Sequence, residues 1–244
     1  MSRAGRAVPR LATDVVPLTT PIKTRATSSV AAADAPASAS LEANGVNTAD
    51  QTNYSFATVA IGAADPTRVL IIGVGGRSTS GDVTVSSFIV DGSAATSIGH
   101  ANGGAGTEAA DFFAIPWPNN TTATIAVNHS GGIVNCSYSV YAAYNLLNGG
   151  AASDVQTGAP AGTWSNNVSV PDGGIIVGFG EPGGSTALPT VTWAGITEDV
   201  DAVGEGVIGR TSAHGALSSG GSVAVSITLS AAVISLPAVV ASFR

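Results

Sequence analysis

The sequence predicts an all-β fold, a two-sheet β-sandwich of jelly-roll type that follows an extended N-terminal arm. Three observations support this fold class. Short runs of β-branched residues recur from Gln51 onward, separated by Gly, Asp-Gly, Asn and Pro turns. Hydrophobic residues make up 44% of the chain but aromatic residues only 5%, so most are small or β-branched and suit pleated strands. No 3.6-residue periodicity recurs after Gln51, so we expect almost no helix there.

Residues 1–50 are expected to form a basic, extended arm and linker. They contain four prolines and no sustained period of 2 or 3.6 residues. The Ala-rich tract at residues 30–39 offers a short helix as the alternative, although Pro36 disfavours it. The basic residues of the arm are Arg3, Arg6, Arg10, Lys23 and Arg25.

Residues 51–244 are expected to form the β-sandwich body. Alternating or continuous apolar runs between turn residues mark fourteen short strands. Many short strands with turns between them predict a sandwich or barrel rather than βαβ units. The predicted strands are residues 54–61, 69–74, 83–90, 94–98, 109–115, 123–127, 133–144, 164–170, 174–179, 190–193, 198–203, 207–213, 222–229 and 233–243.

A faint internal duplication relates residues 68–144 to residues 174–243. Four sequence blocks resemble one another in the same order, beginning with Leu70-Ile-Ile-Gly-Val-Gly and Ile175-Ile-Val-Gly-Phe-Gly. Chance similarity between small-residue β sequences is the alternative interpretation. Because two units of this size without disulfides would be marginally stable alone, we expect them to share one core, with Ile71 and Ile176 at equivalent positions.

Charge and cysteine content limit the partners of the protein. Residues 1–30 carry five basic residues and one acidic residue, whereas the remaining residues carry four basic and 15 acidic ones. An acidic body argues against nucleic-acid binding, since phosphate contacts need a basic surface. No apolar stretch is long enough for a membrane-spanning helix, so we expect no membrane partner. Cys136 is the single cysteine, which leaves no intramolecular disulfide, and we expect it in the core.

Motifs for catalysis or metal binding are weak, and we expect no enzyme activity, cofactor or metal. The stretch from Gly73 to Gly81 lacks the spacing of a phosphate loop and is expected to be a hairpin loop with positive φ angles. The three histidines, His100, His129 and His214, lie in turn-like surroundings without a metal-binding or triad motif.

Acidic and aromatic residues offer three further candidates. Residues 198–205 alternate carboxylates that can supply oxygen ligands to calcium, although a solvated strand face explains them more simply. Glu108 and Asp111 can each contribute to a glycosidase pair only with another acid across a groove. Trp117, between Pro116 and Pro118, is the best candidate for contact with a glycan; the alternative is that it folds back over the end of the sandwich.

Part of the body resembles β-sandwich proteins found among the structural genes of tailed bacteriophages. The resemblance is carried by a run of the type R-x-L-x-x-x-V at Arg68, a run of the type V-x-x-x-x-x-G-x-x-A-T that ends in Asp91-Gly-Ser-Ala-Ala-Thr, the A-x-P of Phe113-Ala-Ile-Pro, and Tyr138-Ser-Val-Tyr. It spans residues 68–144 and brings no catalytic residue with it. The resemblance implies a β-sandwich fold and a place in a virion.

We therefore expect a non-enzymatic virion structural protein: a head decoration protein, a head fibre or a tail component. The arm is expected to bind other virion proteins, and projecting phage proteins suggest a homo-oligomer, with a trimer favoured by analogy. A carbohydrate-binding or adhesion module for a host surface glycan, located at the bacterial cell surface or secreted, is the alternative, and a glycan hydrolase a weaker third. The arm residues expected to contact the partner are the five basic residues named above and Val15, Val16, Leu18 and Ile22.

Overall fold

The computed structural model describes residues 35–78, 81–103, 108–158, 162–183, 188–206, 208–231 and 233–244. The regular structure of these residues is all β, in sixteen strands, so the predicted fold class is confirmed. The compact unit that holds the strands covers Asp34–Arg244. The first eight strands are β1 (Ser38–Asn47), β2 (Gln51–Ala60), β3 (Val69–Ser78), β4 (Val85–Val90), β5 (Ser93–Ala94), β6 (Thr96–Asn102), β7 (Glu108–Pro116) and β8 (Thr122–Tyr144). The last eight are β9 (Ala152–Gly158), β10 (Trp164–Val170), β11 (Ile175–Gly180), β12 (Val191–Ala194), β13 (Thr197–Glu205), β14 (Ile208–Ala216), β15 (Gly221–Leu229) and β16 (Ala238–Phe243).

Each predicted strand overlaps an observed one, but β1 and β9 were not predicted. The arm and linker were expected to reach residue 50, and this boundary is wrong for residues 38–47. These residues pair with β8 along a ladder that runs from Ser38 opposite Tyr144 to Asn47 opposite Cys136. Residues 38–44 alternate polar and apolar residues, but the apolar ones are two alanines and a single leucine, and alanine has a low β propensity. Pairing with β8 therefore contributes more to this strand than the propensity of its own residues.

The strands form two jelly rolls, and in each roll the antiparallel strand pairs are nested one inside the next along the chain. In the first roll, residues 38–144, β1 and β2 pair with the two halves of β8, β3 pairs with β7, and β4 with β5. In the second roll, residues 152–243, β9 pairs with β16, β10 with β15 and β11 with β14. Such nested antiparallel pairs define a jelly roll. The inner sheets have matching orders, β1-β8-β3-β7-β6 and β9-β16-β11-β14-β13, and so do the outer sheets, β2-β8-β4 and β10-β15-β12.

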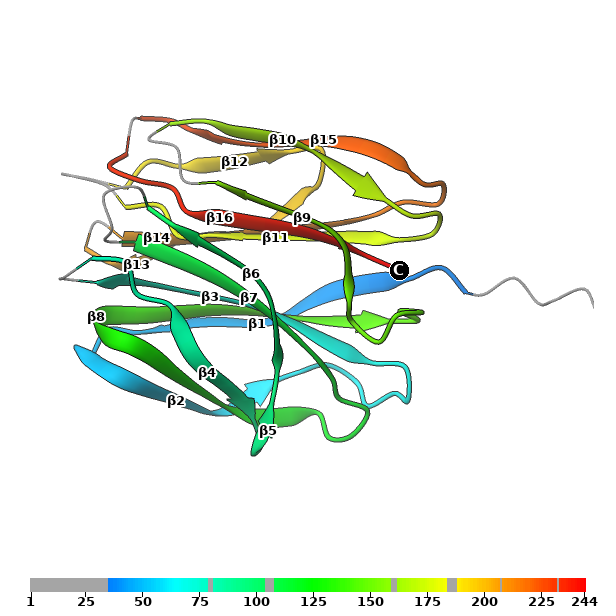
Figure 1. Ribbon diagram of the computed structural model, residues 1–244, viewed down its shortest axis with the longest axis horizontal. Helices are drawn as coiled ribbons and strands as arrows, with labels where there is room; N and C mark the ends of the chain where they lie inside the picture. The colour runs from blue at the N-terminus through cyan, green and yellow to red at the C-terminus, as the bar shows by residue number, and fades with distance from the viewer. Residues whose placement is uncertain are drawn as a thin grey trace, which may run out of the picture. The chain divides into compact units, whose positions relative to one another are not determined.

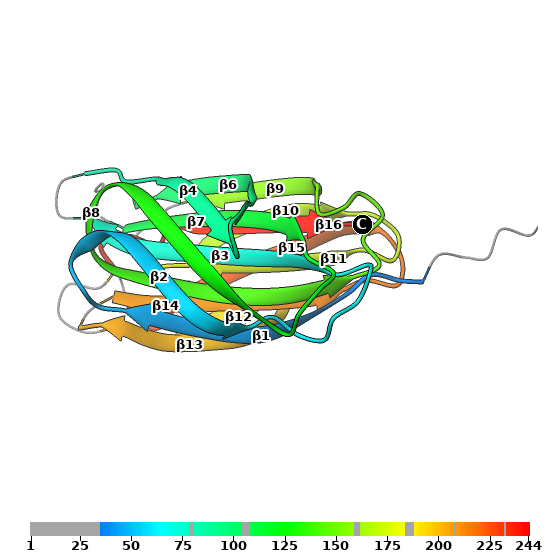
Figure 2. The same cartoon turned by 90° about the horizontal axis from the view of Figure 1, so that it is seen from below.

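Strand β8 belongs to two layers of the first roll. Its residues 122–129 pair with β2 and β4 in the outer sheet, whereas residues 133–144 pair with β1 and β3 in the inner sheet. Figure 2 shows the strand curling from one layer to the other. The bend falls at Gly131 and Gly132, where the absence of side chains eases a sharp turn of a strand.

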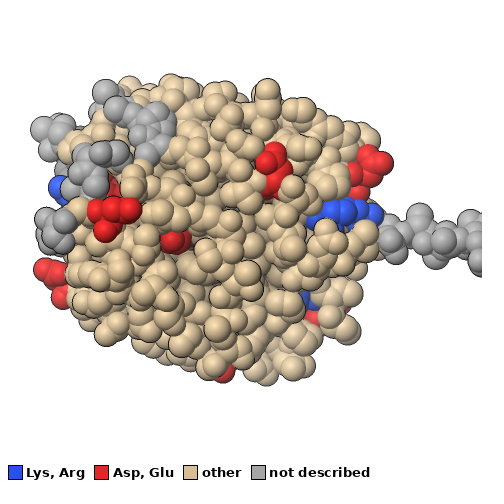
Figure 3. Space-filling view, viewed as in Figure 1, with Lys and Arg blue, Asp and Glu red and all other residues tan. Residues whose placement is uncertain are grey.

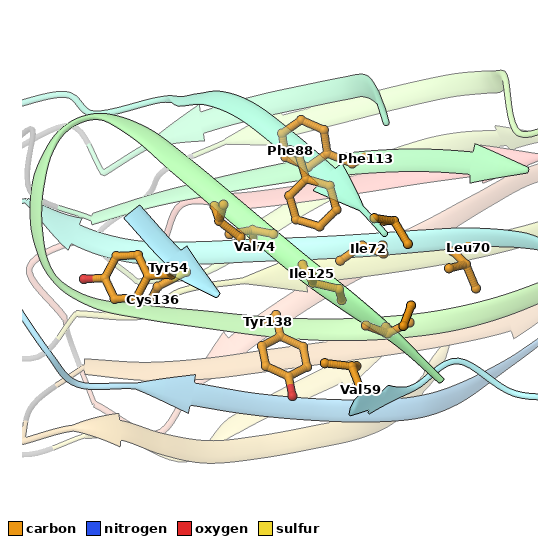
Figure 4. Packing of buried hydrophobic residues seen from close by; sticks show 14 of the residues in the cluster. Tyr54, Val59, Leu70, Ile72, Val74, Phe88, Phe113, Ile125, Cys136 and Tyr138 are labelled. Atoms are coloured by element: carbon orange, nitrogen blue, oxygen red, sulfur yellow. The ribbon is translucent and has the colours of Figure 1, made fainter. Parts of the chain in front are cut away.

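Four sheet layers stack on one another, with the outer sheet of the second roll at the top of Figure 1 and that of the first roll at the bottom. Buried apolar side chains fill all three gaps between the layers. One cluster lies inside the first roll (Figure 4), one inside the second, and the third between the two inner sheets. The structure differs here from the expected single core, because each roll closes two sheets over a core of its own.

The expected equivalence of Ile71 and Ile176 is wrong. Ile71 lies in the cluster between the inner sheets, whereas Ile176 lies in the core of the second roll. Successive residues of a strand point to opposite faces, so an alignment that is one residue out exchanges the two layers. The matching strand orders, rather than the aligned letters, relate the two rolls.

The glycines of β3 also differ from expectation. Gly73, Gly75 and Gly76 lie within the strand and not in a hairpin loop, and among the described residues of that stretch only Gly81 has a positive φ, 119°. A Cβ atom at Gly73 would overlap the ring of Phe179 in the second roll. Gly73 and Gly75, where a Cβ atom would meet Phe179 and Glu181, therefore let the two inner sheets approach each other closely.

Candidate functional site

Two buried carboxyl groups cross between the rolls at the end where β3 finishes and β7 begins. Glu181 follows β11 of the second roll and reaches β8 of the first roll. Glu108 begins β7 of the first roll and reaches Ser235, just before β16 of the second roll. Each roll thus contributes one carboxyl group that accepts hydrogen bonds from side chains of the other roll. We call Glu108, Asn135, Ser137, Glu181 and Ser235 the carboxyl exchange.

The side chain of Glu181 is fully buried among polar groups of the first roll. Its Oε2 accepts a hydrogen bond from Oγ of Ser137 at 2.6 Å, and its Oε1 accepts one from Nδ2 of Asn135 at 3.3 Å. A Cβ atom at Gly75 would lie 2.5 Å from Oε2, so only glycine leaves room for this carboxyl group. Burial raises the pKa of Glu181 to about 8, while the hydrogen bonds and the charge of Arg210 act in the opposite direction.

The carboxyl group of Glu108 is held from both rolls. Ser235 donates its hydroxyl hydrogen to Oε2, and Nε of Arg77 lies 3.7 Å from Oε1. Gly183 of the second roll packs against this carboxyl group, where a Cβ atom would overlap it. The backbone N–H of Arg77 donates to Oδ1 of Asn135 at 3.0 Å, which links the surroundings of both glutamates.

The two acids considered for glycan hydrolysis, Glu108 and Asp111, do not face a common groove. Glu108 points into the space between the rolls, whereas Asp111, an odd number of residues along β7, points to the other face. Asp111 accepts a hydrogen bond from Nδ1 of His100 at 3.0 Å, and Asp82 lies 3.3 Å from Nε2. Hydrogen bonding and charge from Asp111 raise the pKa of His100.

The acidic strand β13 uses its carboxylates within the fold. Glu198 and Asp201 accept the backbone N–H groups of Trp193 and Val191, at 3.1 and 3.0 Å, and so cover the edge of β12. Asp199 points elsewhere, to Nδ1 of His214 at 2.8 Å and to the hydroxyl of Tyr141 at 2.8 Å. Among the described residues no group of three or more His, Cys, Asp or Glu side chains is placed to hold a metal ion.

The aromatic candidate for glycan contact is half-buried. Trp117 packs against the core of the first roll, which corresponds to the folded-back alternative. Trp164 and Trp193 are 5% and 6% exposed and lie in the core of the second roll. A role of Trp117 in glycan binding stays a prediction.

No structural role was predicted from the sequence for two charged residues that organise the fold, Glu181 and Arg68. Arg68 is 1% exposed, and the five N–H groups of its guanidinium reach six backbone carbonyls of two loops. Arg68 directly precedes a continuous apolar strand and Glu181 directly follows one, in a chain with few charges. This position was the only feature of the sequence that could have indicated their importance. The accepting carbonyls are those of Ile61, Gly62, Ala63, Trp117, Asn119 and Asn120.

The arm residues expected to contact a partner, from Arg3 to Arg25, lie outside the described residues. In the part of the chain that is described, no helix is long and apolar enough to cross a membrane. Comparison with known proteins does not assign the chain to a family, because no protein-family model and no curated protein sequence matches it.

Proposed function

We propose that this chain is a non-enzymatic structural protein of a tailed-bacteriophage virion, acting as a head decoration protein, a head fibre or a tail component. The observation that carries the proposal is the pair of stacked jelly rolls. Jelly rolls are common in viral capsid proteins, although they also occur in lectins and other classes. Fold alone does not define function, so the proposal also uses what the polar residues do.

Polar residues of catalytic type in the described part of the chain serve the fold. Glu108 and Glu181 join the rolls, Asp111 binds His100, and Glu198 and Asp201 cover the edge of β12. Few Lys, Arg, Asp or Glu side chains lie on the face drawn in Figure 3. A surface with few charges suits packing beside other subunits, since few charged groups lose water on contact.

The N-terminal arm is proposed to bind other proteins of the particle. Its five basic residues contrast with the acidic body and would pair with an acidic receiving surface. Val15, Val16, Leu18 and Ile22 would supply apolar contacts, and the nearby prolines lower the entropy lost when the arm becomes ordered. The body would project from the particle, as a homo-oligomer with a trimer favoured.

Quantitative mass spectrometry of purified particles tests the proposal. Particles of a phage that encodes this chain should contain it at a fixed copy number relative to the major capsid protein, through repeated density-gradient purification. A chain found only in the soluble fraction of the lysate would contradict a structural role in the virion.

A further inference from the structure

The two rolls are joined differently at their two ends. At the end where β1 begins and β16 finishes, backbone hydrogen bonds link them: Ala37 N–H donates to the carbonyl of Gly173 at 2.9 Å, and Asn148 N–H to that of Arg244 at 3.0 Å. None of the described ladders pairs a strand of the first roll with one of the second. Towards the opposite end the contacts are made by side chains: the carboxyl exchange, and the hydrogen bond that Nη2 of Arg210 donates to Oδ1 of Asn44.

We propose that Glu181 is a proton-dependent latch between the two jelly rolls. With its proton, the side chain holds the inner sheets together at the end that carries Gly75 and Gly183. When it loses the proton, this contact weakens and the end of the interface loosens. The device is a property of the body and does not depend on the proposed place in a virion.

The geometry restricts what the carboxyl group can do when it is charged. It is fully buried between the sheets, and the hydrogen-bond donors placed on it, Ser137 and Asn135, are neutral. Among the described residues no cationic side chain donates a hydrogen bond to it. An ionised carboxylate in this position therefore lacks the paired charge that makes burial of an ion tolerable.

The charged and titratable groups around Glu181 come from four strands. Arg210 on β14 favours the ionised form, but it donates its one described hydrogen bond to Oδ1 of Asn44, at 2.8 Å. Glu108 on β7 disfavours ionisation, and Arg77 on β3 is nearer to Glu108. The thiol of Cys136 on β8 is buried in the core of the first roll, and burial, followed by the charge of Glu181, raises its pKa well above the usual value. Loss of water is the largest influence, so the pKa of Glu181 stands near 8.

The direction of the pH effect follows from this pKa. Glu181 ionises near pH 4.5 in the unfolded chain and near pH 8 in the folded protein, so the folded state binds more protons between these values. The stabilisation is complete below about pH 4.5 and is lost as the pH rises through about 8. Over that window the unfolding equilibrium constant should rise by as much as about tenfold per pH unit.

Unfolding of the full chain in denaturant between about pH 6.5 and about pH 9 tests the latch, with wild type, Glu181→Gln and the control Asp50→Asn compared. Glutamine keeps the shape and both hydrogen bonds without the charge, and Asp50 is an exposed carboxylate. The denaturation midpoint of wild type and of Asp50→Asn should fall across this range, and that of Glu181→Gln should stay nearly constant. Equal pH dependence in all three proteins would overturn the proposal.

Two further measurements on the same proteins locate the effect. Hydrogen exchange at about pH 9, corrected for intrinsic rates, should be faster in wild type than in Glu181→Gln at residues 133–140 and 175–183, and equal elsewhere. If Glu181→Gln does not fold, infrared titration of the wild type decides the question. A protonated carboxyl band that persists to about pH 8 supports the latch, and its loss together with the ordinary carboxyl groups near pH 4 to 5 overturns it.

Discussion

Replacing Arg68 should destabilise the first roll more than any other single change of a charged residue. The side chain is buried at the start of β3, and its guanidinium joins the loop after β2 to the loop after β7. The two N–H groups of Nη1 are shared among three carbonyls of the first loop, and the three N–H groups of Nε and Nη2 reach three carbonyls of the second. Arg68→Met keeps the length of the stem and removes all of these bonds.

The magnitude follows from the positions of the carbonyls. One of the six bonds, to the carbonyl of Ile61, is buried, and the other five are part-buried, where water can replace the lost donor. Counting about 2 kcal/mol for the buried bond and about 0.5 kcal/mol for each of the others, we expect a loss of about 4 to 5 kcal/mol. Arg68→Lys keeps the charge but not the planar fork, so about half of this loss is expected.

Equilibrium unfolding in urea at pH 7, followed by circular dichroism and tryptophan fluorescence, measures the change. Arg244→Met is the matched control, because Arg244 reaches carbonyl oxygens only at 3.4 and 3.5 Å, and it should cost less than about 1 kcal/mol. A free energy of unfolding for Arg68→Met within about 1 kcal/mol of the wild type would refute the role assigned to these hydrogen bonds.

Two other substitutions test the packing of buried groups. Burial lowers the pKa of His129 to about 4, so between about pH 6.5 and 4 only the unfolded state binds the proton. The free energy of unfolding should therefore fall by about 3 kcal/mol over this range in the wild type but not in His129→Phe. Equal pH dependence of the two proteins in acid denaturation would contradict this. Gly73→Ala should lower the thermal midpoint by at least about 5 °C, because its Cβ atom would overlap Phe179, whereas Gly221→Ala, which meets nothing within 4 Å, should leave it nearly unchanged. Equal midpoints by calorimetry would show that the sheets can move apart without cost.

The sequence was sufficient to predict strands wherever apolar alternation or a continuous β-branched run lay between turn residues. It failed for β1, whose half-buried face is built mainly from alanine and one leucine rather than from β-branched residues, and it divided β8 in two because Gly131 and Gly132 resemble a turn. The sequence also did not predict on which side of its sheet a residue packs. A one-residue offset in a faint alignment moved Ile71 and Ile176 to different cores.

The polar site was harder to predict than the fold. Glu181 receives its hydrogen bonds from residues 44 and 46 positions away, and Glu108 meets Ser235 across 127 positions. Periodicity describes only near neighbours along the chain, so it cannot bring such groups together. The histidine contacts were not predicted either: His100 lies 3.0 Å from Asp111 and His214 2.8 Å from Asp199, each across a pair of strands.

Deletion of residues 1–30 tests the central claim most directly. The full chain and the truncated chain would be supplied in equal amounts during particle assembly, and their copy numbers measured in purified particles at low and high salt. We predict that the truncated protein folds, with the circular dichroism and thermal midpoint of the intact body, but is missing from the particles, and that high salt releases the full chain because basic residues carry the contact. Incorporation of the truncated protein at normal copy number would contradict attachment through the arm and would place the docking surface on the jelly rolls.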